Sequence, residues 1–107
     1  MKHVYFQNTE SIDSLTLGLE GSAKMAVKLV SDETVVIELE PGGHTPDHTH
    51  GDKERLVVLS GEGEIKVAGG QKKIKPGDFL EFDSDEAHQI INTGKETLAF
   101  FCFRNQK

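Results

Sequence analysis

The chain has 107 residues, enough for one domain, and a folded chain of this size buries roughly two-thirds of the surface that it exposes when unfolded. Hydrophobic residues make up 36% and charged residues 28%, which is the balance of a globular protein rather than of a disordered or membrane-embedded one. Lys and Arg number 12 against 18 Asp and Glu, and the basic residues are scattered along the chain. This distribution argues against nucleic acid or an anionic membrane as a partner.

The chain shows no sign of a second domain or of a targeting segment. No linker, repeat or low-complexity tract divides it, so we expect a single domain over residues 1–107. The N-terminus lacks an apolar stretch of signal-peptide length, and no apolar run is long enough to span a membrane, which predicts a cytoplasmic location. The one cysteine, Cys102, lies in an apolar run and cannot form an intramolecular disulfide, so we expect it to be buried in the core.

Short segments that favour β-structure alternate with turn residues about every 8 to 12 residues, as in an all-β sandwich or barrel. Among the turn signals is Pro41-Gly42-Gly43. Residues 7–19 carry no clear pattern, and the sequence leaves open whether they form a turn of helix or a loop. The predicted strands are Ala23–Val30, Thr34–Glu40, Arg55–Ser60, Glu64–Ala68, Gln71–Lys75, Asp78–Phe82, His88–Asn92 and Leu98–Arg104.

The apolar residues of these strands predict which faces are covered. In Thr34–Glu40 alternation predicts one buried face, with Val35, Ile37 and Leu39, and one face that is largely wet. The run from Leu98 to Phe103 is apolar on both faces, which suggests that a second subunit covers one of them, so we expect a homodimer. Seven residues are candidates for a pocket wall or for ordinary core, namely Ile37, Leu39, Leu56, Val58, Phe79, Ile90 and Phe100.

Polar residues suited to chemistry gather just after the predicted strand Thr34–Glu40. His48 and His50 point the same way if the backbone is extended, and Glu54 shares their parity. His88 begins a later strand, and a barrel can bring it opposite the first three residues. Three imidazoles and one carboxylate suit a divalent transition metal and leave positions open for water, dioxygen or substrate.

Each of these residues also has an ordinary interpretation. A His-x-His pair is often simply solvated, Glu54 alone would be a surface charge, and His88 alone the polar end of a strand. Against this, an inward-facing histidine without a partner costs about 1–3 kcal/mol, which favours a metal. His44 shares the parity of His48 and is the candidate catalytic acid or base, with an exposed turn residue as the alternative.

Two motifs in this sequence resemble those of the cupin family. Gly42-x5-His48-x-His50-x3-Glu54-x6-Gly61 fits the first cupin motif throughout. The second, Gly-x5-Pro-x-Gly-x2-His-x3-Asn, is matched at Gly77, His88 and Asn92, whereas its inner Pro and Gly are replaced here by Asp83 and Asp85. This departure leaves the shape of the loop before His88 open, although Asp also suits a turn.

The resemblance implies a single-domain cupin-like jelly-roll β-barrel that holds one divalent transition metal through His48, His50, Glu54 and His88. Iron or manganese is favoured, and zinc, nickel and copper also occur in the family. Cupin activities diverge, so the fold does not name the reaction. We expect a metal-dependent enzyme acting on a small organic substrate, with a dioxygenase as the leading reaction class and an isomerase, lyase or decarboxylase also open. The alternative is a non-catalytic module that binds a sugar or carboxylate through the metal.

Overall fold

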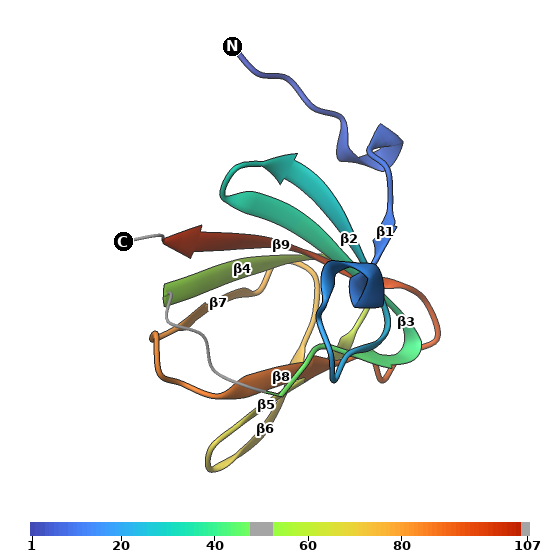
Figure 1. Cartoon of the computed structure of the whole chain (residues 1–107). Helices are drawn as coiled ribbons and strands as arrows, with labels where there is room; N and C mark the ends of the chain where they lie inside the picture. The colour runs from blue at the N-terminus through green and yellow to red at the C-terminus, as the bar shows by residue number, and fades with distance from the viewer. Residues whose placement is uncertain (48–52, 106–107) are drawn as a thin grey trace.

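The computed structural model describes residues 1–47 and 53–105, and these form an antiparallel all-β fold (Figure 1). Two short 3₁₀ helices, η1 (Phe6–Asn8) and η2 (Ser14–Leu17), lie near the N-terminus. No helix of the described part is long and apolar enough to cross a membrane. The strands are β1 (Ile12–Asp13), β2 (Ala23–Ser31), β3 (Thr34–His44), β4 (Lys53–Ser60), β5 (Gly63–Val67), β6 (Gly70–Ile74), β7 (Phe79–Phe82), β8 (His88–Ile91) and β9 (Leu98–Asn105).

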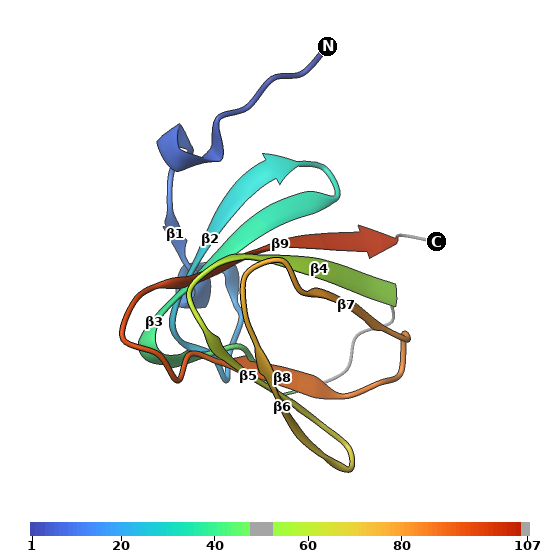
Figure 2. The ribbon, with the colours of Figure 1, turned by 180° about the vertical axis from the view of Figure 1, so that it is seen from behind.

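The strands form one sheet that curls into a barrel, which confirms the predicted fold class. The strand order is β6-β5-β8-β3-β9-β4-β7, and β2 pairs with both β1 and β3. Figures 1 and 2 show that the curl places β4 and β7 opposite β8 across the barrel. Residues on β4 and β8 that point inward therefore face one another, although they are far apart in the sequence.

The third strand is longer than predicted, because Pro41-Gly42-Gly43 does not end it. Up to Leu39, β3 pairs with β9, and at His44 it pairs with Ile91 of β8. Gly42 has φ = 84°, and a Cβ on Gly43 would lie 2.8 Å from two backbone carbonyl oxygens of β2. The two glycines thus let the strand bend between its two partners, which is why a turn signal lies inside a strand here.

The core fills the inside of the barrel with residues from most strands. Leu39, Leu56, Leu98 and Phe100 are among the most deeply buried side chains. Cys102 is buried as predicted, at 4% exposure. Asn92, the last residue of the second motif, is also buried; its Nδ2 donates to the carbonyls of Leu39 and Glu96, and its Oδ1 accepts from a backbone N–H, each at 2.8 Å.

The N-terminal segment covers part of the outer face of the sheet, and the predicted wet face of β3 is only partly wet, with Glu40 exposed but Val36 buried. Val36 on this face is fully buried. The Phe6 ring packs edge-on against Phe101, with centroids 5.6 Å apart. The buried Lys28 donates to the carbonyls of Phe6 and Gln7 and pairs with Glu38 at 3.8 Å. The chain itself therefore covers part of the apolar outer face that suggested a partner subunit, and the homodimer stays a prediction.

Candidate functional site

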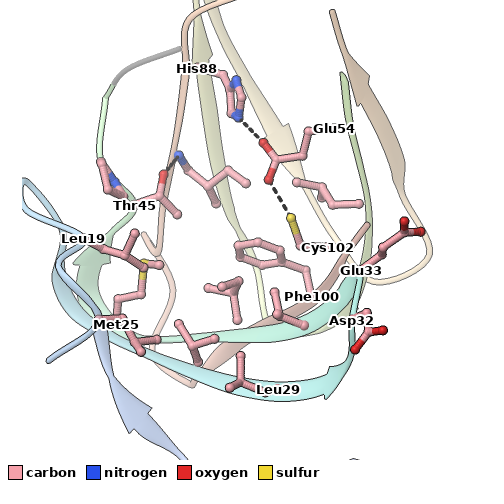
Figure 3. Close-up of a pocket in the computed structure, with 17 residues that line it drawn as sticks. Leu19, Met25, Leu29, Asp32, Glu33, Thr45, Glu54, His88, Phe100 and Cys102 are labelled. Atoms are coloured by element: carbon pink, nitrogen blue, oxygen red, sulfur yellow. Dashed lines mark hydrogen bonds and ion pairs between the residues drawn. The ribbon is translucent and has the colours of Figure 1, made fainter. Parts of the chain in front are cut away.

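A cavity of about 290 Å³ lies inside the barrel, between the inner faces of β2 and β3 and the strands β4, β8 and β9 (Figure 3). This volume is at the lower end of the range of small-molecule sites, roughly 300–1,000 Å³. Figure 3 shows Glu54, His88 and Cys102 together on one side of the cavity, and Met25, Leu29 and Asp32 on the opposite side. The cavity therefore has a polar side and a mainly apolar side.

Two of the four predicted metal ligands meet at the polar side. Glu54 near the start of β4 and His88 at the start of β8 are both buried, and Glu54 Oε1 lies 2.9 Å from His88 Nε2. His48 and His50 lie outside the described residues. Within the described part, no three His, Cys, Asp or Glu residues form a group that could hold a metal, so the structure brings together one pair of the predicted set.

The neighbours of Glu54 and His88 explain their placement. Phe82 of β7 is the cross-strand partner of Glu54, and its ring stacks on the His88 ring with centroids 3.9 Å apart and planes 3° from parallel. The segment before His88 is a turn in which the Glu86 N–H donates to the Asp83 carbonyl at 3.1 Å. Asp83 thus supports a turn where the family motif has proline.

Hydrogen bonds determine the protonation of His88. Nδ1 lies 3.0 Å from the Glu86 carbonyl oxygen, which can only accept, so Nδ1 carries a proton. Burial lowers the pKa of His88, but the hydrogen bonds to Glu54 and to the Glu86 carbonyl and the charges of these two residues outweigh burial. The pKa of His88 consequently lies above its usual value, which favours the imidazolium form beside the Glu54 carboxylate.

Cys102 has a role in the site that the sequence analysis did not predict. Its thiol donates to Glu54 Oε2 with a sulfur–oxygen distance of 2.6 Å, and the residue lines the cavity. Both carboxylate oxygens of Glu54 therefore have a partner. The signal available in the sequence was the parity of Cys102 with Phe100 and Leu98, which places all three on the inner face of β9.

His44, the candidate catalytic residue, is half-buried at the end of β3 but is not among the described residues that line the cavity. Its Nδ1 lies 3.1 Å from the Thr45 carbonyl oxygen and 3.4 Å from Gln89 Nε2. Thr45 does line the cavity, and its hydroxyl accepts a hydrogen bond from the Ile90 N–H at 2.9 Å. A catalytic role for His44 stays a prediction.

The predicted wall residues divide into three groups. Ile37, Leu56, Ile90 and Phe100 line the cavity, whereas Leu39 and Val58 are buried core residues outside its lining. Phe79 is neither, since it is 57% exposed. It alternates with Leu80, which packs on the core, so Phe79 points away from the barrel.

Part of the apolar side comes from residues 7–19, for which the sequence predicted no definite structure. Leu17 at the end of η2 and Leu19 after it both line the cavity. Asp13 caps η2 by accepting from the Leu15 N–H at 2.9 Å, and Gly18 ends it with φ = 78°. These cap residues were the available signals, but four residues are too few to show a helical period.

Comparison with known proteins identifies the family. Residues 35–104, more than half of the chain, match the family described as "Cupin domain". The chain therefore belongs to the cupin family, as its two motifs suggested.

Several relatives of this chain are named as enzymes. The chain is 32% identical to L-ectoine synthase of Vibrio campbellii over 65 residues, which cover 60% of this chain and 51% of that protein. The structure of the polyketide cyclase RemF from Streptomyces resistomycificus superposes with a TM-score of 0.85 at 19% identity, covering 97% of this chain and 78% of that one. A predicted oxalate decarboxylase from Thermotoga maritima also gives 0.85, at 25% identity, covering 98% and 99%. The chain spans about a third to a half of the length of the curated relatives that it matches.

Proposed function

We propose that this cupin binds one divalent transition metal through His48, His50, Glu54 and His88, and that it is a metal-dependent enzyme acting on a small organic molecule. A dioxygenase is the leading reaction class, and iron or manganese is the favoured metal. The observation that carries the proposal is the buried Glu54–His88 pair, which faces a cavity large enough for a ligand.

The described residues fit a metal in their chemistry. His88 Nδ1 donates to the Glu86 carbonyl, which is the usual arrangement of a metal-binding histidine and leaves Nε2 as the ligand atom. The proton that Nε2 shares with Glu54 would leave on metal binding, because an imidazole ligand must be neutral. Glu54 would supply a carboxylate oxygen, and its other oxygen is held by the Cys102 thiol.

A bound metal would supply Lewis-acid character and open positions for substrate oxygens or dioxygen. The protein's own contribution is orientation and exclusion of water. Phe82 fixes the plane of the His88 ring by stacking, and Cys102 orients the Glu54 carboxylate. Apolar side chains such as Phe100 and Ile90 make the cavity wall beside them, and they keep water from competing with a bound ligand.

The test is elemental analysis of protein purified without added metal or affinity tag. About one equivalent of a transition metal is expected in the wild type, and its loss is expected in the double variant His48→Ala, His50→Ala. A His3→Ala, Gln71→Ala double variant is the control, because both residues are exposed and neither belongs to the proposed ligand set. No metal in the wild type, even after reconstitution, would contradict the proposal.

Catalysis is tested separately on the loaded protein. Oxygen consumption or a changed substrate supports an enzyme, whereas saturable thermal stabilisation by a ligand that is recovered unaltered supports the binding module. His44→Gln tests the predicted acid or base, since a general acid–base group contributes roughly 10²–10⁴-fold to the rate. A smaller loss would mean that His44 supports Thr45 rather than reacting itself.

A further inference from the structure

Four described residues of the cavity lining are exposed, and Figure 3 shows two of them, Leu29 and Asp32, on the side opposite Glu54 and His88. Leu17 is 42% and Leu29 is 53% exposed, and both line the cavity. Asp32 and Glu33, in the turn between β2 and β3, are exposed lining residues as well. These four residues, which we call the rim, are the exposed residues of the described lining; Leu17 precedes the start of β2, whereas Asp32 and Glu33 follow its end. Figure 3 shows the Asp32 and Glu33 carboxylates at its outer edge.

Between the rim and the polar side, the described lining offers a ligand almost only apolar surface. Met25, Val27, Val35 and Ile37 form the inner face of β2 and β3 along this path. None of the described side chains that line the cavity is a lysine or arginine. A sugar or a phosphorylated molecule would leave several polar groups without partners against this wall, which disfavours its binding.

The carboxylates of Asp32 and Glu33 also select ligands by charge. Asp32 and Glu33 are carboxylates, and no described basic side chain lines the cavity beside them. An anionic group at the rim end of a ligand would meet like charge there. An anionic or hydroxyl group at the other end would instead face the proposed metal ligands.

We infer that this cavity takes an amphipathic ligand with a single polar head directed at Glu54 and His88 and an uncharged apolar body extending toward the rim. An apolar cavity of about 150 Å³ accepts benzene, so one of about 290 Å³ suits a body of two fused rings. This inference rests on the proposed function for the role of the polar side, and it narrows the substrate class by excluding sugars, sugar phosphates and dicarboxylates.

The probe is 2-naphthol, which has one hydroxyl head and a two-ring body. Its binding to the protein as purified is followed by fluorescence titration, with the metal content of the same sample measured in parallel. Saturable binding is expected. 6-Hydroxynaphthalene-2-sulfonate carries the same head and a charge at the far end, and it should bind at least about tenfold more weakly. Glucose 6-phosphate should not bind.

Matched variants locate the binding. Leu29→Asp adds a charge at the rim and should weaken 2-naphthol binding roughly tenfold. Leu15→Asp is the control, because Leu15 is 59% exposed but is not among the lining residues. The double variant Asp32→Asn, Glu33→Gln should narrow the preference for 2-naphthol over the sulfonate, whereas Glu62→Gln, Glu96→Gln at exposed sites elsewhere should leave it unchanged.

Two results would overturn the inference. One is equal binding of 2-naphthol and the sulfonate, or no binding of either, to protein that contains its metal. The other is a wild-type dimer that Leu29→Asp converts to a monomer, since the rim would then be covered by a second copy. Selective binding of 2-naphthol to protein that cannot hold metal would instead contradict the proposed function and leave the inference standing.

Discussion

The two sides of the cavity differ in how strongly their residues depend on one another. Glu54, His88 and Cys102 are buried and come from three different strands, and Glu54 hydrogen-bonds to each of the other two. Leu17 and Leu29 on the rim are exposed, and water can replace a lost contact there. The polar side therefore behaves as one unit in which any loss leaves a buried group without its partner, whereas the rim can vary residue by residue.

The largest expected effect comes from replacing a proposed ligand on the polar side. Glu54→Gln keeps the shape of the side chain but removes the carboxylate charge. Loss of an outer partner of a metal ligand costs about 10–100-fold in affinity, so loss of the ligand itself should cost more than about 100-fold. Metal affinity measured by competition with a chelator checks this, with Glu64→Gln on β5 as the control. Unchanged affinity would remove Glu54 from the ligand set.

The second test uses pH, because the metal-free and metal-loaded proteins should respond in opposite directions. Because the pKa of His88 is raised in the metal-free fold, protonated His88 stabilises that fold. This stabilisation is complete at pH values below 6.5, the ordinary pKa of histidine, and is lost as the pH rises through the raised pKa. Metal binding needs neutral imidazoles, so metal affinity should fall about tenfold per pH unit for each proton displaced, below about 6.5 for an ordinary imidazole and already below the raised pKa for His88.

The measurement is the melting temperature of chelator-treated and metal-loaded protein across this pH range. The gain in melting temperature on loading should grow as the pH rises. His88→Gln should abolish the contribution of His88 to the pH dependence of the melting temperature, whereas His3→Gln at an exposed position should leave that dependence unchanged. A gain that is independent of pH would argue against imidazole ligands.

The third test asks whether the hydrogen bond from Cys102 to Glu54 supports metal binding on the polar side. Cys102→Ala removes the donor to Glu54 Oε2 and should weaken metal binding by about 10-fold, at the lower end of the effect of an outer partner. Cys102→Ser keeps a donor and should lose less. Equal losses in both variants would mean that packing of the thiol, rather than its hydrogen bond, matters.

The smallest effect is expected at the rim. Leu17→Ser should change the free energy of unfolding by no more than about 0.5 kcal/mol, as is usual for exposed positions, and should leave metal affinity unchanged. Urea unfolding and chelator competition check the two quantities. A large loss of metal affinity in Leu17→Ser would show that the rim and the polar side of the cavity are not independent.

Sequence reasoning succeeded where one strand period or one motif determines the outcome. Alternation and turn residues predicted eight of the strands. The motifs grouped Glu54 with His88, and Glu54 Oε1 does lie 2.9 Å from His88 Nε2, while their role as metal ligands stays a prediction. The reason is that β-strands have a fixed two-residue period and that both motif residues occupy the starts of strands.

It failed where a contact depends on segments distant in the chain. The N-terminal segment packs on the outer face, where Phe6 contacts Phe101 of β9 and Lys28 of β2 donates to the Phe6 carbonyl, and residues 7–19 show no local period. The bond between Cys102 and Glu54 depends on the register that pairs Leu56 with Cys102 and Glu54 with Arg104. Such register is set by the whole sheet rather than by either strand alone.

The position of β9 in the sheet has a consequence for the order of folding during synthesis. Among the described strands, β4 and β7 join the rest of the sheet only through β9, the last strand in the chain, which lies between β3 and β4. Thr34 pairs with Phe103, so the ladder that closes the sheet links distant parts of the sequence, a feature that slows folding. A ribosome-bound chain that lacks residues 98–105 has every proposed metal ligand but no strand to join β4 to β3. The proposed metal site can therefore form only after all of its residues have been made and β9 has joined β3 to β4.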